Sequence, residues 1–282
     1  MAPLRFSANL SWLFPSVPSL PARLEAAAAA GFSAVEAAWP AGCPAEALRA
    51  AAERAGAQMV LLNAPPGEPR DGELGLAAVP GRQEAFRQGL EAAVGYGRAL
   101  RCPRIHLMAG RVPLGADRAA VAGEMETTFI ENLRYAADLL AQEDMIGLVE
   151  PINSRITDPR YFLNTPHQAA AILEKVGRPN LKLQLDLFHC QIMDGNVSGN
   201  LEKYFPLIGH IQIAQVPGRH EPDSPGELNY NYIFELLESL GYSGYVGCEY
   251  APKGDTVEGL GWLRSYWESR GLPHGGTSKV AE

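Results

Sequence analysis

Short apolar segments alternate with longer segments of helical periodicity along almost the whole chain. The helical segments repeat apolar residues at steps of three and four, as in Phe86, Leu90 and Val94. Strands that alternate with helices build βαβ units, which join into a parallel sheet through right-handed crossovers. Eight apolar segments are expected to be strands: Leu4–Leu10, Ala34–Ala38, Gln58–Asn63, Arg104–Met108, Ile146–Pro151, Leu181–Phe188, Gly209–Ala214 and Tyr245–Tyr250.

Eight strand–helix units in 282 residues are typical of a single (β/α)8 TIM barrel, the closed form of the α/β class. The open doubly wound sheet is the alternative, and it usually carries a glycine-rich turn after its first strand. Residues 8–12 read ANLSW instead, and no GxxxxGK[ST] motif occurs. We therefore predict one barrel domain over residues 1–272. The polar, glycine-rich residues 273–282 are expected to form a flexible C-terminal tail.

The composition is that of a globular protein and argues against several other classes. The 24 Lys+Arg and 32 Asp+Glu residues give a formal net charge of −8, which disfavours a protein that coats nucleic acid or an anionic membrane. No apolar run approaches the roughly 20 residues that span a bilayer. The N-terminal segment MAPLRFSANLSWLF does not have the pattern of a secretory signal, and the four cysteines lie far apart. We expect a cytoplasmic protein without nucleic-acid or membrane partners.

Three connections, 64–81, 152–166 and 215–229, are much longer than the others. Each follows a predicted strand, so in a barrel all three lie at the C-terminal face, where barrel enzymes carry their active sites. Long loops in a compact domain are more often functional than accidental. This face is therefore the expected position of a functional site.

Polar side chains interrupt four of the later predicted strands near their C-terminal ends. Alternation along a strand places them opposite the aliphatic residues, so we expect them to point into the barrel and converge at its mouth. A buried carboxylate costs several kcal/mol unless it is paired or metal-bound. The oxygen ligands suit Mg²⁺ or Mn²⁺, with Zn²⁺ less favoured. The four residues are Glu150, Asp186, Gln212 and Glu249. The alternative is a set of internal ion pairs with Lys182, Arg155 or Arg104.

The segments around these four residues resemble the hydroxypyruvate isomerase family, within the xylose-isomerase-like barrels. The similar segments are GLVEPIN, LQLDLFHCQIMDGN, GHIQIAQVPGRHEPDSPGELNY and GYVGCEY, and the resemblance covers nearly the whole chain. It implies a barrel that interconverts hydroxypyruvate and 2-hydroxy-3-oxopropanoate (tartronate semialdehyde). It also implies that Glu150 and Glu249 are the acid/base pair, and that Asp186 and Gln212 complete a divalent-metal site with them. Related sugar epimerases carry histidine at the position of Gln212.

The chemistry agrees with these residue types. Moving a carbonyl between neighbouring carbons requires removal of one proton and delivery of another, which two carboxylates can perform around an enediol. The substrate carboxylate needs a cation, for which we prefer Arg219, then Arg155, with Arg111 as a third candidate; for each, a surface ion pair is the alternative. His189 and His106 either contact the substrate or pack in the barrel. We expect Asn63, Glu36 and Trp39 to line the pocket wall, and Trp12 and Phe14 either to form an apolar lip or to pack.

Three other functions compete with this hypothesis. An isomerase or epimerase of a longer sugar acid or ketose, such as a 2-oxo-tetronate, would share the carboxylate pair and differ in pocket depth. A metal-dependent nuclease would need clustered histidines and a basic groove, whereas the six histidines are dispersed and the net charge is −8. A barrel that only binds partners would be expected to have lost the carboxylates. We therefore expect an enzyme with a small hydroxy-keto acid substrate; a monomer and a homo-oligomer are both compatible with the sequence.

Overall fold

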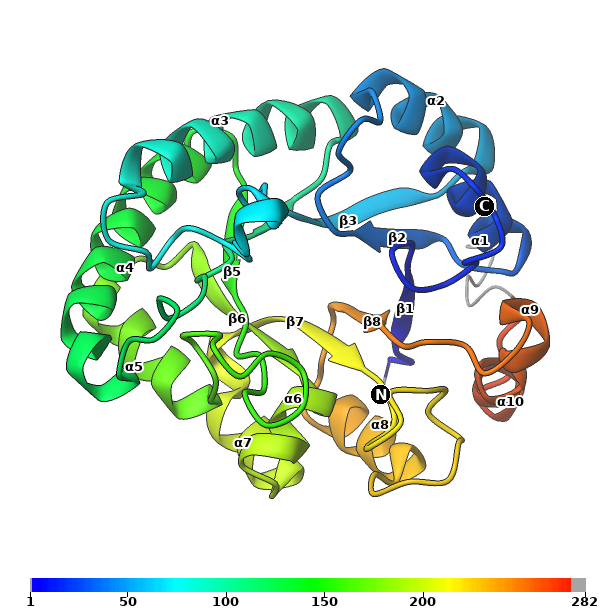
Figure 1. Cartoon of the computed structure of the whole chain (residues 1–282). Coiled ribbons are helices and arrows are strands. Elements are labelled where there is room, and N and C mark those ends of the chain that lie inside the picture. The colour runs from blue at the N-terminus through cyan, green and yellow to red at the C-terminus, as the bar shows by residue number, and fades with distance from the viewer. Residues whose placement is uncertain (1, 275–282) are drawn as a thin grey trace.

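Eight parallel strands close into a barrel in a computed structural model that describes residues 2–274. The strands follow one another around the ring in chain order, and β1 pairs with β8 to close it (Figure 1). This arrangement confirms the predicted single (β/α)8 barrel. The strands are β1 (Arg5–Asn9), β2 (Ala34–Ala37), β3 (Gln58–Asn63), β4 (Arg104–His106), β5 (Ile146–Val149), β6 (Leu181–Asp186), β7 (Ile208–Ile213) and β8 (Tyr245–Cys248).

Helices surround the strands and bury the outer faces of the sheet (Figure 1). Local sequence sets several of their ends: Asp117 accepts a hydrogen bond from the Ala119 amide at the start of α4, and Gly56 ends α2 in the left-handed conformation. The helices are α1 (Leu20–Ala29), α2 (Ala45–Ala55), α3 (Gln83–Leu100), α4 (Arg118–Ala141), α5 (Pro166–Val176), α6 (Leu187–Met193), α7 (Val197–Tyr204), α8 (Tyr230–Ser239), α9 (Thr256–Gly259) and α10 (Gly261–Ser269), with short 3-10 turns η1 (Pro69–Asp71) and η2 (Phe205–Leu207).

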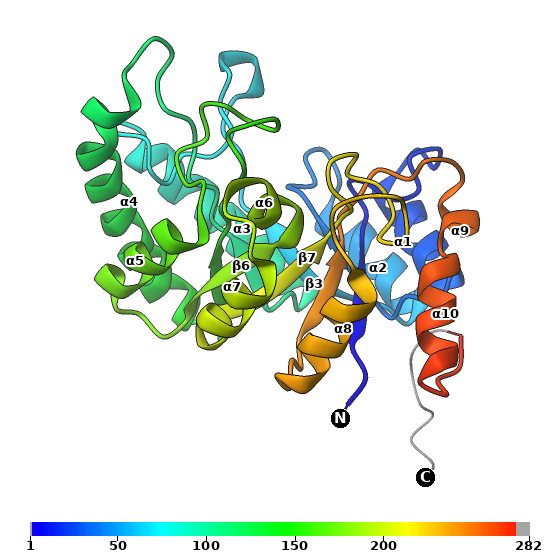
Figure 2. The ribbon, with the colours of Figure 1, turned by 90° about the horizontal axis from the view of Figure 1, so that it is seen from below.

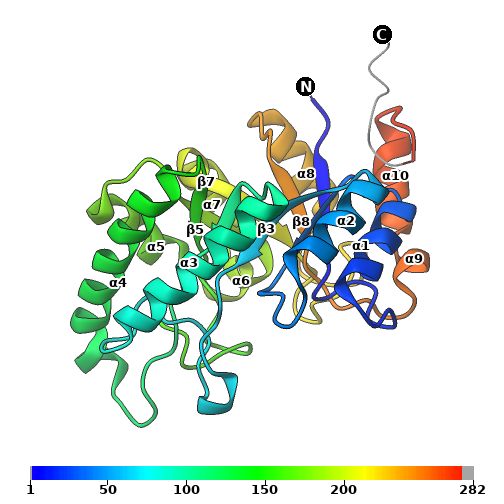
Figure 3. The ribbon, with the colours of Figure 1, turned by 90° about the horizontal axis from the view of Figure 1, so that it is seen from above.

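The long loops gather at one end of the barrel. Figures 2 and 3 show the loops after β3, β4 and β5 standing well clear of the strands, with the start of β1 at the opposite end. These loops follow strands, so they form the C-terminal face, as predicted. No helix in the described part of the chain is long and apolar enough to cross a membrane. Of the predicted tail 273–282, residues 275–282 lie outside the described residues.

Several predicted strands end earlier than expected. The sixth was predicted to reach Phe188 but ends at Asp186, because the Asp186 carboxylate accepts the Phe188 amide (2.8 Å) and starts α6 at Leu187. The fifth ends at Val149, before Pro151, which has no amide hydrogen for the ladder. The strand interiors and their alternation are as predicted, so the polar side chains keep their positions.

The interior of the barrel is polar on several strands. Glu36 of β2 is fully buried and accepts hydrogen bonds from Ser7 (2.8 Å), Asn9 (3.1 Å), His210 (2.8 Å) and Gln212 (2.8 Å). Burial alone would raise the pKa of Glu36, but His210 and the hydrogen bonds from Gln212 and Ser7 lower it below its ordinary value. The expectation that Glu36 lines the pocket wall is therefore wrong: it is a buried anion at the centre of the barrel.

Candidate active site

Three carboxylates converge at the C-terminal mouth of the barrel. Glu150 directly follows β5, Asp186 ends β6 and Glu249 directly follows β8. Glu150 and Asp186 are buried, and Glu249 is half-buried. The Arg219 guanidinium lies between two of them, with Nη2 2.7 Å from Glu249 Oε2 and 3.4 Å from Asp186 Oδ2. The predicted convergence of polar side chains therefore occurs for these three residues, and Arg219 joins two of them.

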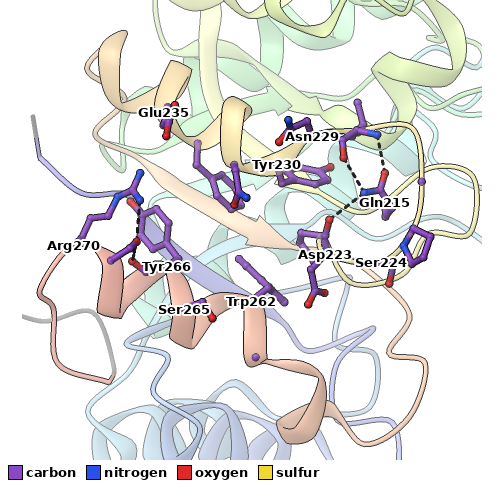
Figure 4. A pocket seen from close by; sticks show the side chains of 18 residues that line it. Gln215, Asp223, Ser224, Asn229, Tyr230, Glu235, Trp262, Ser265, Tyr266 and Arg270 are labelled. Atoms are coloured by element: carbon purple, nitrogen blue, oxygen red, sulfur yellow. Dashed lines mark hydrogen bonds between the residues drawn. The ribbon is translucent and has the colours of Figure 1, made fainter.

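The loop after β7 is built to hold Arg219. Its residue Gln215 donates from Nε2 to the carbonyls of Pro222 and Leu228 (both 3.0 Å) and accepts the Leu228 amide (2.9 Å), as Figure 4 shows. The Arg219 amide donates to the Gln215 carbonyl (2.7 Å), and Arg219 itself has a left-handed backbone, with φ of 54°. This compact turn directs the guanidinium back into the mouth.

Aromatic rings cover the faces of the same guanidinium. Its central carbon lies 4.4 Å from the centre of the Trp12 ring and 4.8 Å from that of Phe188. Cation–π contacts of this kind are stronger where water is excluded. Trp12, expected to form an apolar lip, thus contacts the cation of the site.

The other expected cations lie elsewhere. Arg155 is exposed and donates to the Met193 carbonyl (3.5 Å), and Lys182 donates to the Pro206 carbonyl (3.2 Å). Arg104 donates to the Gly209 carbonyl (3.0 Å), and Arg111 pairs with Asp158. The alternative of ion pairs with Lys182, Arg155 or Arg104 is therefore wrong, since the carboxylates meet Arg219 instead.

Two buried histidines flank Glu150. His106 Nδ1 lies 3.4 Å from Glu150 Oε2 and 3.3 Å from the side-chain oxygen of Asn63, a half-buried residue at the end of β3. His189 Nε2 lies 3.8 Å from Glu150 Oε1 and 3.6 Å from Asp186 Oδ2. Burial lowers the pKa of His106 to about 3 and that of His189 to about 4. Both rings are therefore neutral at physiological pH and carry one N–H each.

Burial and mutual repulsion hold protons on the glutamates. Burial raises the pKa of Glu150 well above its ordinary value, and the charges of Glu249 and Asp186 raise it further. Burial also raises the pKa of Glu249 to about 8, against the opposing effect of Arg219. The two groups titrate as an interacting pair that retains at least one proton at neutral pH. A proton donor and a proton acceptor can therefore coexist in this site.

The donor set suits a divalent cation. Glu150, Asp186 and His189 each offer a ligand atom, and these atoms lie within 4.8 Å of one another. With Glu249, three carboxylates lie at the mouth, and Arg219 contacts two of them, so a cation of higher charge would offset their repulsion. Gln212 is differently engaged: its Oε1 accepts from Gln184 (2.7 Å) and its Nε2 donates to Glu36 (2.8 Å).

Comparison with known proteins places this site in a family. Residues 24–266 match the family described as xylose isomerase-like TIM barrel. A human protein named putative hydroxypyruvate isomerase is 68% identical over 276 residues, which cover 98% of this chain and 100% of that protein. The chain belongs to the hydroxypyruvate isomerase family.

Relatives outside the animals share the same fold and length. A protein of Cupriavidus necator named 2-oxo-tetronate isomerase is 47% identical, with 93% of this chain and 98% of that protein covered. A crystal structure from Brucella melitensis, titled as an AP endonuclease of family 2, superposes with a TM-score of 0.87 at 45% identity and covers 93% of this chain and 98% of that one. The relatives by sequence are named isomerases, and by family the chain is an isomerase enzyme.

The sequence did not single out two asparagines that contact the residues of this candidate site. Asn9 donates from Nδ2 to Glu249 Oε1 (3.0 Å) and to Glu36 Oε1 (3.1 Å), so it links the mouth to the buried anion below. Asn153 contacts His189 from the loop after β5. Each lies at or just beyond the C-terminal end of a strand. The expectation that polar side chains at strand ends reach the mouth, which selected Glu150 and Glu249, could therefore have identified these asparagines as well.

A separate groove of about 840 Å³ lies outside the barrel, between α8, α10 and the loop after β7. Figure 4 shows Tyr230, Trp262 and Tyr266 along it, with Glu235 and Arg270 toward one end. None of the three carboxylates of the mouth lines this groove. This groove is therefore separate from the cluster of carboxylates at the barrel mouth.

Proposed function

We propose that the enzyme interconverts hydroxypyruvate and 2-hydroxy-3-oxopropanoate by proton transfer between Glu150 and Glu249. The observation that carries the proposal is a pair of glutamates with raised pKa values, which enter one mouth from β5 and β8. Family membership supports the same reaction, since the human relative at 68% identity is named a putative hydroxypyruvate isomerase. The cytoplasm and carbohydrate metabolism remain the expected setting.

The proposed reaction balances as two proton exchanges. The ionised glutamate removes a proton from C3 of hydroxypyruvate, and the C3 hydroxyl loses its proton as the aldehyde forms. The protonated glutamate delivers a proton to C2, and the former ketone oxygen gains one to become a hydroxyl. The enediol between these steps carries negative charge on its oxygens, which neutral N–H donors such as those of His106 and His189 can stabilise.

Arg219 supplies the positive charge for the substrate carboxylate. Its Nη2 is engaged by Glu249 and Asp186, whereas its Nε has no hydrogen-bond partner among residues 2–274. A buried N–H without a partner is costly, so an anionic oxygen at this position would be favourable. Arg155, exposed on its loop, is the weaker candidate. Asn63 and His106 would line the opposite side of the substrate.

Glu150, Asp186 and Glu249 would hold a divalent cation, Mg²⁺ or Mn²⁺ in preference to Zn²⁺, and that cation would stabilise negative charge on the enediol oxygens. Gln212 was expected to complete the set. Because its Oε1 already accepts from Gln184, Gln212 could serve as a ligand only through the second lone pair of that oxygen.

A longer substrate is the second candidate. The relative named 2-oxo-tetronate isomerase is 47% identical over 93% of this chain, so a four-carbon 2-oxo acid could use the same acid/base pair. The ratio of kcat/KM for hydroxypyruvate and for a 2-oxo-tetronate decides between the two. A higher value for the four-carbon acid would favour the second candidate.

Solvent deuterium tests the acid/base assignment. Wild-type enzyme in D₂O should incorporate deuterium into hydroxypyruvate, and chelator should slow the exchange. Glu150→Gln and Glu249→Gln should each lower turnover at least about 100-fold, the usual contribution of a general acid or base. Glu235→Gln, an exposed residue of α8, is the matched control and should behave as wild type. Unchanged turnover in both mouth variants would remove the two glutamates from the proposed role.

A further inference from the structure

The loop after β5 fixes the orientation of one buried amide. Asn153 is fully buried, and its Oδ1 lies 3.0 Å from the backbone nitrogens of both Ile156 and Thr157. Backbone amides can only donate, so the atom that faces them is the carbonyl oxygen. The other end of the side chain is therefore the NH₂ group. It lies 2.8 Å from Thr157 Oγ1 and 2.7 Å from His189 Nδ1.

The same residue approaches His189 a second time. The backbone N–H of Asn153 points at His189 Nδ1 from 3.3 Å, beside the side-chain NH₂. A ring nitrogen that faces two donors has to accept, which means that it carries a lone pair and no proton. The ring proton of His189 then resides on Nε2, the nitrogen that faces Asp186 and Glu150 at 3.6 and 3.8 Å.

We propose that Asn153 is a positioning residue that holds His189 as the neutral tautomer protonated at Nε2. His189 consequently offers the mouth a hydrogen-bond donor and not a metal-binding lone pair. Histidines that bind metals usually donate their other N–H to an oxygen acceptor. His189 has the reverse arrangement, because its outer nitrogen receives hydrogen bonds. A cation in this mouth would therefore be held by the carboxylates, although His189 Nε2 lies close to two of them.

The loop is braced in a way that keeps this geometry fixed. The Asp158 amide donates to the Asn153 carbonyl (3.1 Å), and the buried Asp158 carboxylate accepts from Arg111 Nε (2.6 Å). Arg111 also donates to the Gly72 carbonyl (2.7 Å), which ties the loop after β3 to the loop after β5. Arg111, considered above as a substrate-binding cation, is thus part of the support of Asn153.

For the isomerisation, and resting on the function proposed above, the donor at Nε2 would bind the substrate oxygen that gains negative charge. A neutral donor suits an enediol better than an imidazolium, because it does not give its proton away before the carbon acid is ionised. The tautomer set by Asn153 would then matter for turnover more than for substrate affinity.

Nitrogen NMR of ¹⁵N-histidine-labelled protein, recorded without substrate, tests the proposal directly. Protonated and unprotonated ring nitrogens have well-separated shifts, and the His189 signals are assigned by their loss in His189→Gln. Wild type should show a proton on Nε2 and a bare Nδ1. Asn153→Asp keeps the acceptor for Ile156 and Thr157 but sets an oxygen against Nδ1, so it should move a proton to Nδ1. A wild-type ring protonated at Nδ1, or an unchanged ring in Asn153→Asp, would overturn the proposal.

Kinetics and metal binding supply independent readouts. Asn153→Asp should lower kcat about 100-fold with KM within about threefold of wild type, the pattern of a lost transition-state donor. Asn164→Asp, on the same loop but bonded to Ser154, is the matched control and should change neither. Mn²⁺ titration of His189→Gln should give an affinity within about threefold of wild type, and a loss of 100-fold or more would show that His189 is a ligand. An enzyme that shows the predicted tautomer but does not turn over hydroxypyruvate would refute the proposed function alone.

Discussion

Gly247 of β8 is predicted to be essential for the stability of the barrel, because it leaves room for the buried Glu36 carboxylate. A Cβ atom added at this position would lie 2.4 Å from Glu36 Oε2 and 2.5 Å from Glu36 Oε1, well inside van der Waals contact. A carboxylate at the end of a flexible side chain could normally move aside. Here it is fully buried and accepts hydrogen bonds from Ser7, Asn9, His210 and Gln212, so it cannot move without breaking some of them.

The expected cost of Gly247→Ala follows from two terms. Overpacking a core by one methyl group costs about 1–3 kcal/mol, and each lost hydrogen bond to a charged group costs about 1.5–3 kcal/mol. We expect the free energy of unfolding to fall by about 3–5 kcal/mol. For a chain of this size, that corresponds to a melting temperature lower by roughly 6–20 °C. Asn9 joins Glu36 to Glu249, so kcat should fall as well.

Urea unfolding at pH 7 measures this effect. The matched control is Gly95→Ala in α3, where an added Cβ meets nothing within 4 Å, and alanine in a helix interior should stabilise by about 0.5–1 kcal/mol. The two glycine-to-alanine substitutions should thus change the free energy of unfolding in opposite directions. A Gly247→Ala protein within 1 kcal/mol of wild type would refute the reasoning, because it would show that the Glu36 network yields without loss.

Two further predictions concern the charges of the mouth. The pKa of Glu249 is raised to about 8 from an ordinary 4.5, so between these pH values the folded state binds more protons than the unfolded state. Without added metal, the free energy of unfolding should therefore fall by up to about 1.4 kcal/mol per pH unit as the pH rises from 5 to 8. Urea unfolding of Glu249→Gln should show a flatter profile, and parallel profiles would contradict the assignment. Arg219→Met should lower kcat/KM for hydroxypyruvate about 100-fold, because the substrate carboxylate loses the guanidinium that pairs with it. An unchanged KM would argue that the substrate carboxylate binds elsewhere.

The strand pattern predicted the barrel and the convergence of polar side chains at its mouth, because both depend on local rules. Apolar segments become strands, and alternation decides that Asp186 and Gln212 point inward while Leu185 and Ile211 face the helices. The end of β6 was missed by two residues, because an aspartate that caps the following helix ends a strand that hydrophobicity alone would extend.

Partners across the barrel could not be predicted in this way. Glu36 was assigned to the pocket wall, but it lies beneath the mouth because His210 and Gln212, more than 170 residues further along the chain, meet it there. The direction of an arginine side chain is even harder to predict from the sequence. Arg155 and Arg219 both follow strands in long loops, and only the turn held by Gln215 directs Arg219 inward. The direction of a long side chain depends on loop conformation, which no periodicity encodes.

The three carboxylates differ in how they are held, and this difference suggests a division of labour. Asp186 accepts the Phe188 amide and faces Arg219. Glu249 accepts from Asn9 and Arg219, and the latter is also the expected partner of the substrate. Glu150 lies close to the two histidines, 3.4 Å from His106 and 3.8 Å from His189. A substrate that draws Arg219 away from Glu249 would favour a proton on Glu249, so that substrate binding would itself prepare the acid of the proposed pair.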